Sequence, residues 1–224
     1  MNTKKVIINK QGEEHSFLDT NNQDFYMFTK EAKVVIDGCG SLPFSEVGAR
    51  LYSQLLYNYG SIAPANFEDV TKLIFQKFKK FCQEDDSLLY NNFAFTILAC
   101  FETEEEFIVF SCGDGYIITK KDNQISFIKL DDGEYPKYYV YNYLQKRDSL
   151  EQYKEGVDFD IQVFSKKEYQ NVGVATDGLR FYKNLNQVEQ NRLFSYLLEG
   201  KKAQIGMLIN RNRETFKDDI TICF

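Results

Sequence analysis

The chain has 224 residues, of which 43% are hydrophobic and 16% aromatic, enough apolar material for a sizeable core. Its formal net charge of −6 argues against a broad nucleic-acid-binding surface. No apolar stretch has the length of a membrane span, and the N-terminus lacks the apolar core of a signal peptide. The five cysteines are odd in number and form no Cys-x-x-Cys pair, which disfavours a disulfide framework and indicates a reducing compartment. We therefore expect a cytoplasmic protein that binds neither nucleic acid nor membrane.

The chain contains only three prolines and no Ser-, Gly- or Pro-rich linker, which predicts a single domain over residues 1–224. Ten segments have the β-branched and aromatic composition of strands. In chain order they are Lys5–Asn9, Phe25–Thr29, Lys33–Ile36, Phe93–Phe101, Glu106–Ser111, Tyr116–Lys120, Gln124–Leu130, Phe159–Phe164, Asn171–Thr176 and Ile220–Phe224. Turn sequences at Thr103–Glu105 and Lys120–Asn123 predict hairpins and therefore antiparallel sheets.

Four segments have the periodicity of helices. Ser45 is expected to cap the first, which ends near Asn58, with Gly60 suited to the left-handed residue beyond it. The other three are Phe67–Phe81, Gln187–Leu198 and Ala203–Ile209. Two helices follow the first acidic strand end and two precede the last. This order predicts an α+β layered domain, with antiparallel sheet covered by helices on its outer faces.

Three carboxylates stand at strand ends or turns far apart in the chain. Asp37 follows an apolar run and precedes Gly38, Asp177 follows another, and Asp218 precedes the last strand. Carboxylates that converge from rigid strands form the all-oxygen sites that hard divalent cations prefer. Two such cations can bind a phosphate and generate a hydroxide for in-line attack.

Two further acidic motifs lie between these three, and the order of all five is informative. The motifs are Asn22-Gln23-Asp24, Val34-Val35-Ile36-Asp37-Gly38-Cys39-Gly40, Ser111-Cys112-Gly113-Asp114-Gly115, Val174-Ala175-Thr176-Asp177-Gly178-Leu179 and Lys217-Asp218-Asp219-Ile220-Thr221. In this order they resemble the metal-dependent Ser/Thr protein phosphatases of the type 2C or PPM class, in their compact bacterial form. The resemblance implies a four-layer α-β-β-α sandwich, in which two antiparallel sheets are flanked by helix pairs.

The resemblance also implies roles for single residues. Asp37 resembles the catalytic aspartate that bridges two Mg²⁺ or Mn²⁺ ions, and the Gly38 carbonyl resembles a ligand of one ion. Asp177 and Asp218 resemble the carboxylates of the other ion. Asp114 matches the aspartate of a third, weaker ion.

Gln23 and Asp24 stand where the family holds metal-bound waters. The implied activity is that of a protein-serine/threonine phosphatase, which hydrolyses phosphomonoesters by a hydroxide bridging the two ions, without a covalent phosphoenzyme. Its implied partners are a phosphorylated protein substrate and a cognate Ser/Thr kinase, which places it in signalling.

The sequence departs from the family pattern at four places. The position of the arginine that grips the substrate phosphate is Asp19, whose carboxylate would repel a phosphate dianion. Cys39 stands where relatives often have His or Met. The usual Gly-Asp-Ser-Arg has become Gly113–Tyr116, and the Gly-Thr/Ser-Thr signal before the central strands has become Asn91–Phe95. The metal-binding half of the site is therefore better matched than its phosphate-binding half.

The phosphate-binding residue stays unknown at this stage. A surrogate for the missing arginine could be Lys10, His15, Arg50 or Arg180, among which the sequence does not choose. The tyrosine-rich segment Tyr135–Tyr143 either packs in the core or forms a flap beside the site.

Three other interpretations of the sequence compete with an active phosphatase. A catalytically weak or inactive relative would act as a regulatory module that binds a phosphoprotein, which Asp19 favours. A sheet protein with accidental Asp-Gly turns would bind no cation. A dinucleotide-binding loop after Ile36 is disfavoured, because Pro43 takes its third glycine position and the flanking strands form hairpins.

Overall fold

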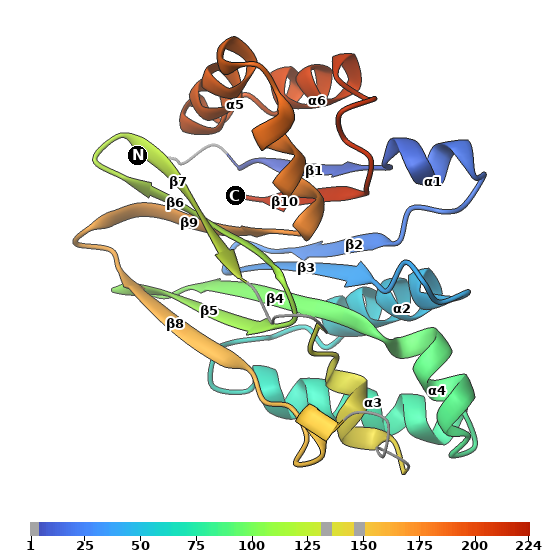
Figure 1. Cartoon of the computed structure of the whole chain (residues 1–224). Coiled ribbons are helices and arrows are strands. Elements are labelled where there is room, and N and C mark those ends of the chain that lie inside the picture. The colour runs from blue at the N-terminus through green and yellow to red at the C-terminus, as the bar shows by residue number, and fades with distance from the viewer. Residues whose placement is uncertain (1–4, 131–135, 146–150) are drawn as a thin grey trace.

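The computed structural model describes residues 5–130, 136–145 and 151–224, and Figure 1 shows the whole chain. Its strands form two five-stranded sheets in which every pairing is antiparallel. Sheet A has the order β1 (Ile7–Lys10), β10 (Ile220–Cys223), β9 (Tyr169–Ala175), β6 (Gly115–Lys121) and β7 (Gln124–Leu130). Sheet B has the order β2 (Asp24–Phe28), β3 (Ala32–Gly38), β4 (Phe95–Glu102), β5 (Glu106–Cys112) and β8 (Asp160–Ser165).

Helices cover both outer faces of the paired sheets (Figure 1). Sheet B carries α2 (Ser45–Asn58), α3 (Phe67–Phe81) and α4 (Asp86–Phe93), and sheet A carries α5 (Gln187–Glu199) and α6 (Lys202–Arg211). The remaining helices are α1 (Glu13–Phe17) and three 3₁₀ segments, η1 (Tyr139–Tyr143), η2 (Glu151–Tyr153) and η3 (Asp177–Asn184). The predicted α+β class and the four-layer α-β-β-α sandwich are confirmed.

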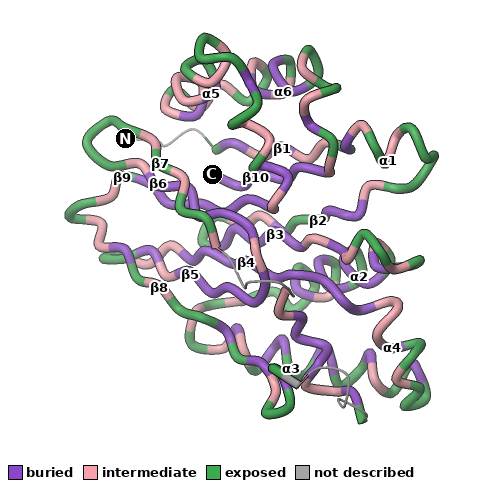
Figure 2. Tube along the Cα trace, in the orientation of Figure 1, coloured by how far each residue is buried: buried purple, intermediate pink, exposed green. Residues whose placement is uncertain are grey.

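Strand β3 shows why the sheets pair. Val34 and Ile36 belong to the core under the sheet B helices, whereas Val35 belongs to the core between the two sheets. Alternate side chains of a strand point to opposite faces, so a strand with three consecutive apolar residues must be covered on both sides. Figure 2 shows the resulting continuous buried centre.

The structure corrects the prediction at two helix boundaries. Ser45 does not cap α2: it is the first helical residue, and its hydroxyl donates to the Cys39 carbonyl at 2.9 Å. Phe93, predicted to begin a strand, ends α4 instead. Gly60 has the left-handed backbone expected of it, with φ of 86°.

Helices α1 and α4 were missed by the periodicity argument. Helix α1 has only five residues, and none of them is buried. Helix α4 has a readable start, because the Asp85 carboxylate accepts hydrogen bonds from the backbone N–H groups of Ser87 and Leu88. Its eight residues are too few for a clear apolar stripe.

The tyrosine-rich segment packs in the core, as one of the two alternatives predicted, and the flap alternative stays a prediction. Tyr135 lies outside the described residues. Tyr139 and Tyr141 are buried in η1, which packs against α3, α4 and β4. Tyr138, directly before η1, lines a cavity at the end of the sandwich together with Pro136.

The five cysteines all lie within the described residues and are free thiols, four of them buried. Among the described residues, no helix is both long and apolar enough to cross a bilayer.

Candidate metal centre

One cavity of about 140 Å³ collects most of the predicted ligands. Six of the seven residues line it: Gln23, Asp37, Gly38, Asp114, Asp177 and Asp218. They come from β2 and β3, from the β5–β6 turn and from the chain on either side of the β9–β10 pairing. Residues up to 195 positions apart in the sequence therefore meet at one end of the sandwich (Figure 1).

The seventh predicted residue, Asp24, lies beneath the cavity and not on its wall. Asp24 is directly opposite Asp37 in the antiparallel pairing of β2 and β3, and its side chain is only 2% exposed. On the other side of Asp37, the opposite residue on β4 is Thr96, which also lines the cavity. Asp37 is therefore fixed by a strand on each side, as a ligand on a rigid element requires.

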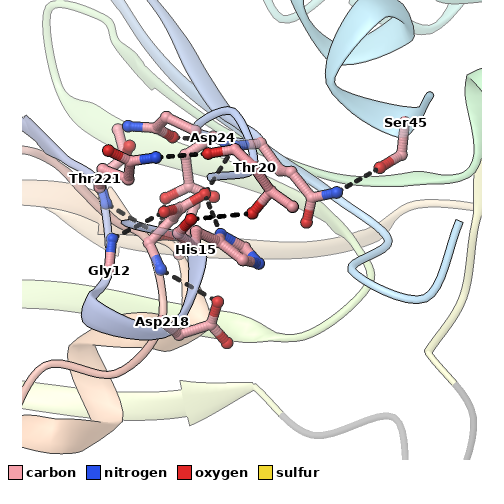
Figure 3. Close-up of polar contacts among 12 residues, drawn as sticks. Gly12, His15, Thr20, Asp24, Ser45, Asp218 and Thr221 are labelled. Atoms are coloured by element: carbon pink, nitrogen blue, oxygen red, sulfur yellow. Dashed lines mark hydrogen bonds and ion pairs between the residues drawn. The ribbon is translucent and has the colours of Figure 1, made fainter. Parts of the chain in front are cut away.

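Thr176 ties Asp24 to sheet A. Its hydroxyl donates to Asp24 Oδ2 at 2.6 Å and accepts from the Thr221 N–H at 2.9 Å. Asn22 fixes the backbone of the same residue, because its side-chain oxygen accepts from the Asp24 N–H at 2.8 Å. Figure 3 shows Asp24 beside Thr221 at the centre of this network.

Asp219 is a second anchor, and the sequence reasoning gave it no role. Its carboxylate is buried and accepts from the N–H of Gly12 at 2.8 Å and from the N–H of Gln23 at 2.6 Å. His15 Nδ1 lies 2.8 Å from the same carboxylate. Asp219 thereby fastens the segment that leads into β2 against the start of β10.

Two close backbone approaches fix the geometry around the cavity. A Cβ on Gly38 would lie 2.8 Å from Ser45 Oγ and 3.2 Å from the Gln23 carbonyl oxygen. A Cβ on Gly178 would lie 1.9 Å from the carbonyl oxygen of Asp219. Gly38 and Gly178 therefore leave no space for a larger residue. A side chain at either position would push the neighbouring backbone segment away.

The carboxylates concentrate negative charge in a partly buried place. Burial raises the pKa of Asp37 well above its ordinary value, and the charges of Asp24, Asp218 and Asp114 raise it further. Burial likewise raises the pKa of Asp24 to about 7, although the hydrogen bond from Thr176 lowers it. These carboxylates can all be ionised together only if a positive charge that the strands do not supply lies close to them.

Arg180 supplies positive charge on one side. Its Nη1 donates to Asp177 Oδ2 and its Nη2 lies 3.0 Å from Asp218 Oδ2. The guanidinium also lies over the Phe181 ring, 4.8 Å from its centroid. Of the four cations considered as phosphate ligands, Arg180 is the one that contacts predicted metal ligands.

The other three lie elsewhere. Lys10 lines a separate groove between β1 and α6, Arg50 is exposed on α2, and His15 is paired with Asp219. Asp19, at the position of the family arginine, is exposed in the turn after α1 and does not line the cavity. Its backbone is left-handed, with φ of 55°.

The donor chemistry fits Mg²⁺ or Mn²⁺. Every candidate ligand in the cavity is an oxygen, and Gln23 Oε1 and Asp24 Oδ1 are buried with no hydrogen-bond partner among the residues that the structure describes. In this conformation, however, no three His, Cys, Asp or Glu side chains of the described residues lie close enough together to hold an ion. In this conformation Asp177 and Asp218 are paired with Arg180 instead.

Comparisons with known structures agree on the fold. Serine/threonine phosphatase Stp1 from Staphylococcus aureus superposes with a TM-score of 0.67 at 16% identity, covering 100% of this chain and 94% of that one. The Streptococcus agalactiae serine/threonine phosphatase gives 0.62 at 17% identity, with 98% and 97% covered. The Mycobacterium tuberculosis phosphatase PstP/Ppp gives 0.59 at 12% identity, with 98% and 96% covered.

At these identities the structural likeness establishes the fold alone. The family model described as protein phosphatase 2C matches residues 11–204, which is most of the chain. The protein therefore belongs to the protein phosphatase 2C family, a family of Ser/Thr phosphatases that are typically metal-dependent. No curated protein sequence matches the chain.

Proposed function

We propose that this protein is a metal-dependent phosphoprotein phosphatase acting on phosphoserine and phosphothreonine. The observation that carries the proposal is the meeting of oxygen ligands from five separate parts of the chain in one cavity of about 140 Å³. Membership of the protein phosphatase 2C family supports it. The cavity has room for ions and a phosphoryl group, which suits a substrate whose body stays outside, as a phosphorylated protein does.

In this proposal Asp37 would be a ligand of two ions, with the Gly38 carbonyl as a further ligand of one and Asp177 and Asp218 as ligands of the other. When bound, Mg²⁺ or Mn²⁺ would activate a water and neutralise charge on the phosphoryl oxygens. Asp114 lines the same cavity and is the candidate ligand of a third, weaker ion.

The neighbouring residues hold this arrangement and its water. Gln23 donates from Nε2 to Ser45 Oγ at 3.3 Å, which leaves its Oε1 for a water on an ion. Asp24 holds the opposite strand position to Asp37 and keeps one oxygen for the same purpose. A phosphorylated protein and its Ser/Thr kinase are the partners that such chemistry requires.

A regulatory phosphoprotein-binding module with little or no turnover is the second candidate. It is favoured by Asp19 at the arginine position and by the cavity walls, where no lysine or arginine occurs among the described lining residues. Such a module would bind a phosphorylated peptide with Mn²⁺ present and release it unhydrolysed.

Hydrolysis of p-nitrophenyl phosphate with and without Mn²⁺ separates the two. We expect Mn²⁺-dependent turnover in the parent and a loss of about 100-fold or more in Asp37→Asn, since a bridging ligand supports several kcal/mol of transition-state stabilisation. Asp122→Asn is the matched control, because Asp122 is exposed in the β6–β7 turn, with φ of 49° that Asn also tolerates.

Turnover that does not need Mn²⁺, or that survives Asp37→Asn, would contradict the enzyme proposal. Binding of a phosphopeptide without turnover would favour the regulatory module. Trapping of a phosphorylated residue of this protein during turnover would contradict direct attack by water.

A further inference from the structure

Arg180 occupies the place between two predicted metal ligands. Asp177 begins η3 and Asp218 precedes β10, and the guanidinium joins their side chains through two different nitrogens. A planar guanidinium matches this task, because its donors form a fixed fork that engages carboxylates in defined directions. Arg180 thus carries the positive charge that an ion at this position would otherwise bring.

The contact differs from an ordinary surface ion pair. Arg180 reaches two acceptors at once, and the ring of Phe181 lies beneath the guanidinium at 4.8 Å. Asp177 and Asp218 are 18% and 36% exposed, so the arginine closes over a partly buried pair. The second oxygen of Asp218, Oδ1, already accepts from the Asp219 N–H at 3.0 Å. An ion that binds Asp177 and Asp218 through their Oδ2 atoms therefore displaces the two guanidinium contacts.

Displacement would leave a cation beside the cavity, next to two of its lining residues. The Arg180 side chain is 45% exposed and has room to turn outward, while its backbone stays in η3 next to Asp177. A freed guanidinium there can bind a phosphate dianion through two parallel N–H···O bonds. The chain needs such a group, since Asp19 stands at the usual arginine position and no described lining residue is a lysine or arginine.

We propose that Arg180 is a displaceable internal cation: it neutralises Asp177 and Asp218 in the metal-free protein, is released when a divalent cation binds them, and then binds the phosphate group of the substrate. The inference rests on the proposed function and deepens it. Metal binding and phosphate binding are coupled through one side chain, so each strengthens the other.

Mn²⁺ binding tests the first half without any measurement of activity. The metal-free parent, Arg180→Gln and the control Arg192→Gln are titrated with Mn²⁺, and free Mn²⁺ is followed by electron paramagnetic resonance. Arg192 is exposed on α5, so its replacement removes the same charge away from the cavity. We expect Arg180→Gln to bind Mn²⁺ about three- to tenfold more tightly at the second ion, since two partly exposed ion pairs no longer compete, and Arg192→Gln to match the parent.

Arg180→Lys sharpens the result. A lysine keeps the charge but offers a single point donor, so it competes for one carboxylate at a time. Its Mn²⁺ affinity should fall between those of the parent and Arg180→Gln. Equal Mn²⁺ affinity in Arg180→Gln and Arg192→Gln, or weaker binding in Arg180→Gln, would overturn the displacement.

Binding of inorganic phosphate to the Mn²⁺-saturated proteins tests the second half by calorimetry. We expect Arg180→Gln to bind phosphate about tenfold or more weakly than Arg192→Gln, because a charge-assisted bidentate contact is lost. Unchanged phosphate affinity would overturn the phosphate role.

The two proposals fail in different ways. If the parent binds Mn²⁺ and hydrolyses p-nitrophenyl phosphate while Arg180→Gln matches Arg192→Gln in both titrations, only this inference is wrong. If neither the parent nor Arg180→Gln binds Mn²⁺, the proposed function and this inference are both wrong. Mn²⁺ binding by Arg180→Gln alone would show that Arg180 excludes the ion and does not yield to it, which would overturn the displacement.

Discussion

The two walls of the cavity compensate their charge differently. Asp37 lies within paired strands, and its buried neighbourhood contains further carboxylates that raise its pKa. Asp177 and Asp218 lie at the ends of sheet A strands, are more exposed than the buried Asp24, and pair with Arg180. The side of the cavity formed by Asp37 (the rigid wall) therefore depends on an added cation to neutralise its charge. The side formed by Asp177 and Asp218 (the exposed wall) is neutralised by Arg180 of the protein itself. We therefore expect a first ion at Asp37 and Gly38, and a second only where Arg180 gives way.

Gly178→Ala tests the close packing of η3, which begins with Asp177, against the residues that precede β10. A Cβ there would meet the Asp219 carbonyl at 1.9 Å, so η3 and β10 must separate. We expect the free energy of unfolding to fall by about 2–4 kcal/mol, because the clash is with backbone. Chemical denaturation of the metal-free protein measures it.

Gly206→Ala is the matched control for that change. A Cβ on Gly206 in α6 has only Lys10 Cε near it, at 3.9 Å. The same substitution should therefore raise the free energy of unfolding by about 0.5–1 kcal/mol through helix propensity. If both variants are neutral, the close approach of Gly178 to Asp219 does not exist in solution.

The link between the walls is tested by Thr176→Val. The Thr176 hydroxyl donates to Asp24 and accepts from the Thr221 N–H, so its removal leaves two buried groups without their partner. We expect a loss of about 1–3 kcal/mol in the free energy of unfolding. Thr176→Ser keeps the hydroxyl and should recover most of it; a serine variant as unstable as the valine variant would show that the methyl group matters instead.

The smallest effect concerns the pH dependence of the His15–Asp219 pair. The hydrogen bond with Asp219 raises the pKa of His15 above its ordinary 6.5, and the charges of Asp219, Asp218 and Asp24 add to this against the opposing effect of burial. Because the folded-state pKa is raised, the pair stabilises fully below about pH 6.5 and loses this contribution as the pH rises through the folded value.

Denaturation of the parent and His15→Gln measures this contribution at two pH values. At about pH 5.5 the parent should be more stable by about 0.5–1 kcal/mol, a modest value since solvent screens a half-buried pair. The gap should shrink at about pH 9, where His15 is neutral. As His15 is the only histidine, the difference between the two proteins isolates its titration. A gap that grows with pH would contradict the pairing.

Local patterns predicted most of the fold. The turn at Asp122 and Asn123 has the two left-handed residues that a tight hairpin needs. The apolar residues of β3 are consecutive because both of its faces are covered. Helix α1 escaped prediction because its five residues bury nothing, so no apolar period exists to be seen.

The site likewise has a part that local sequence motifs predicted and a part that they did not. The predicted oxygen ligands stand in short motifs directly after or before strands, so their gathering followed from the fold. The contact of Arg180 with Asp218 joins residues 38 positions apart, and that of His15 with Asp219 joins residues still farther apart in sequence. Such pairings depend on which side chains meet after folding, and one sequence offers no local signal for them. The roles of the ligands stay predictions until an ion is seen.

A crystal structure of the parent grown with Mn²⁺, with the anomalous signal of manganese recorded, tests the central claim most directly. The account predicts manganese peaks in the cavity against Asp37 and the Gly38 carbonyl, and against Asp177 and Asp218, with Arg180 turned away from both carboxylates. Absence of manganese from the cavity, while Arg180 still joins Asp177 to Asp218, would contradict it.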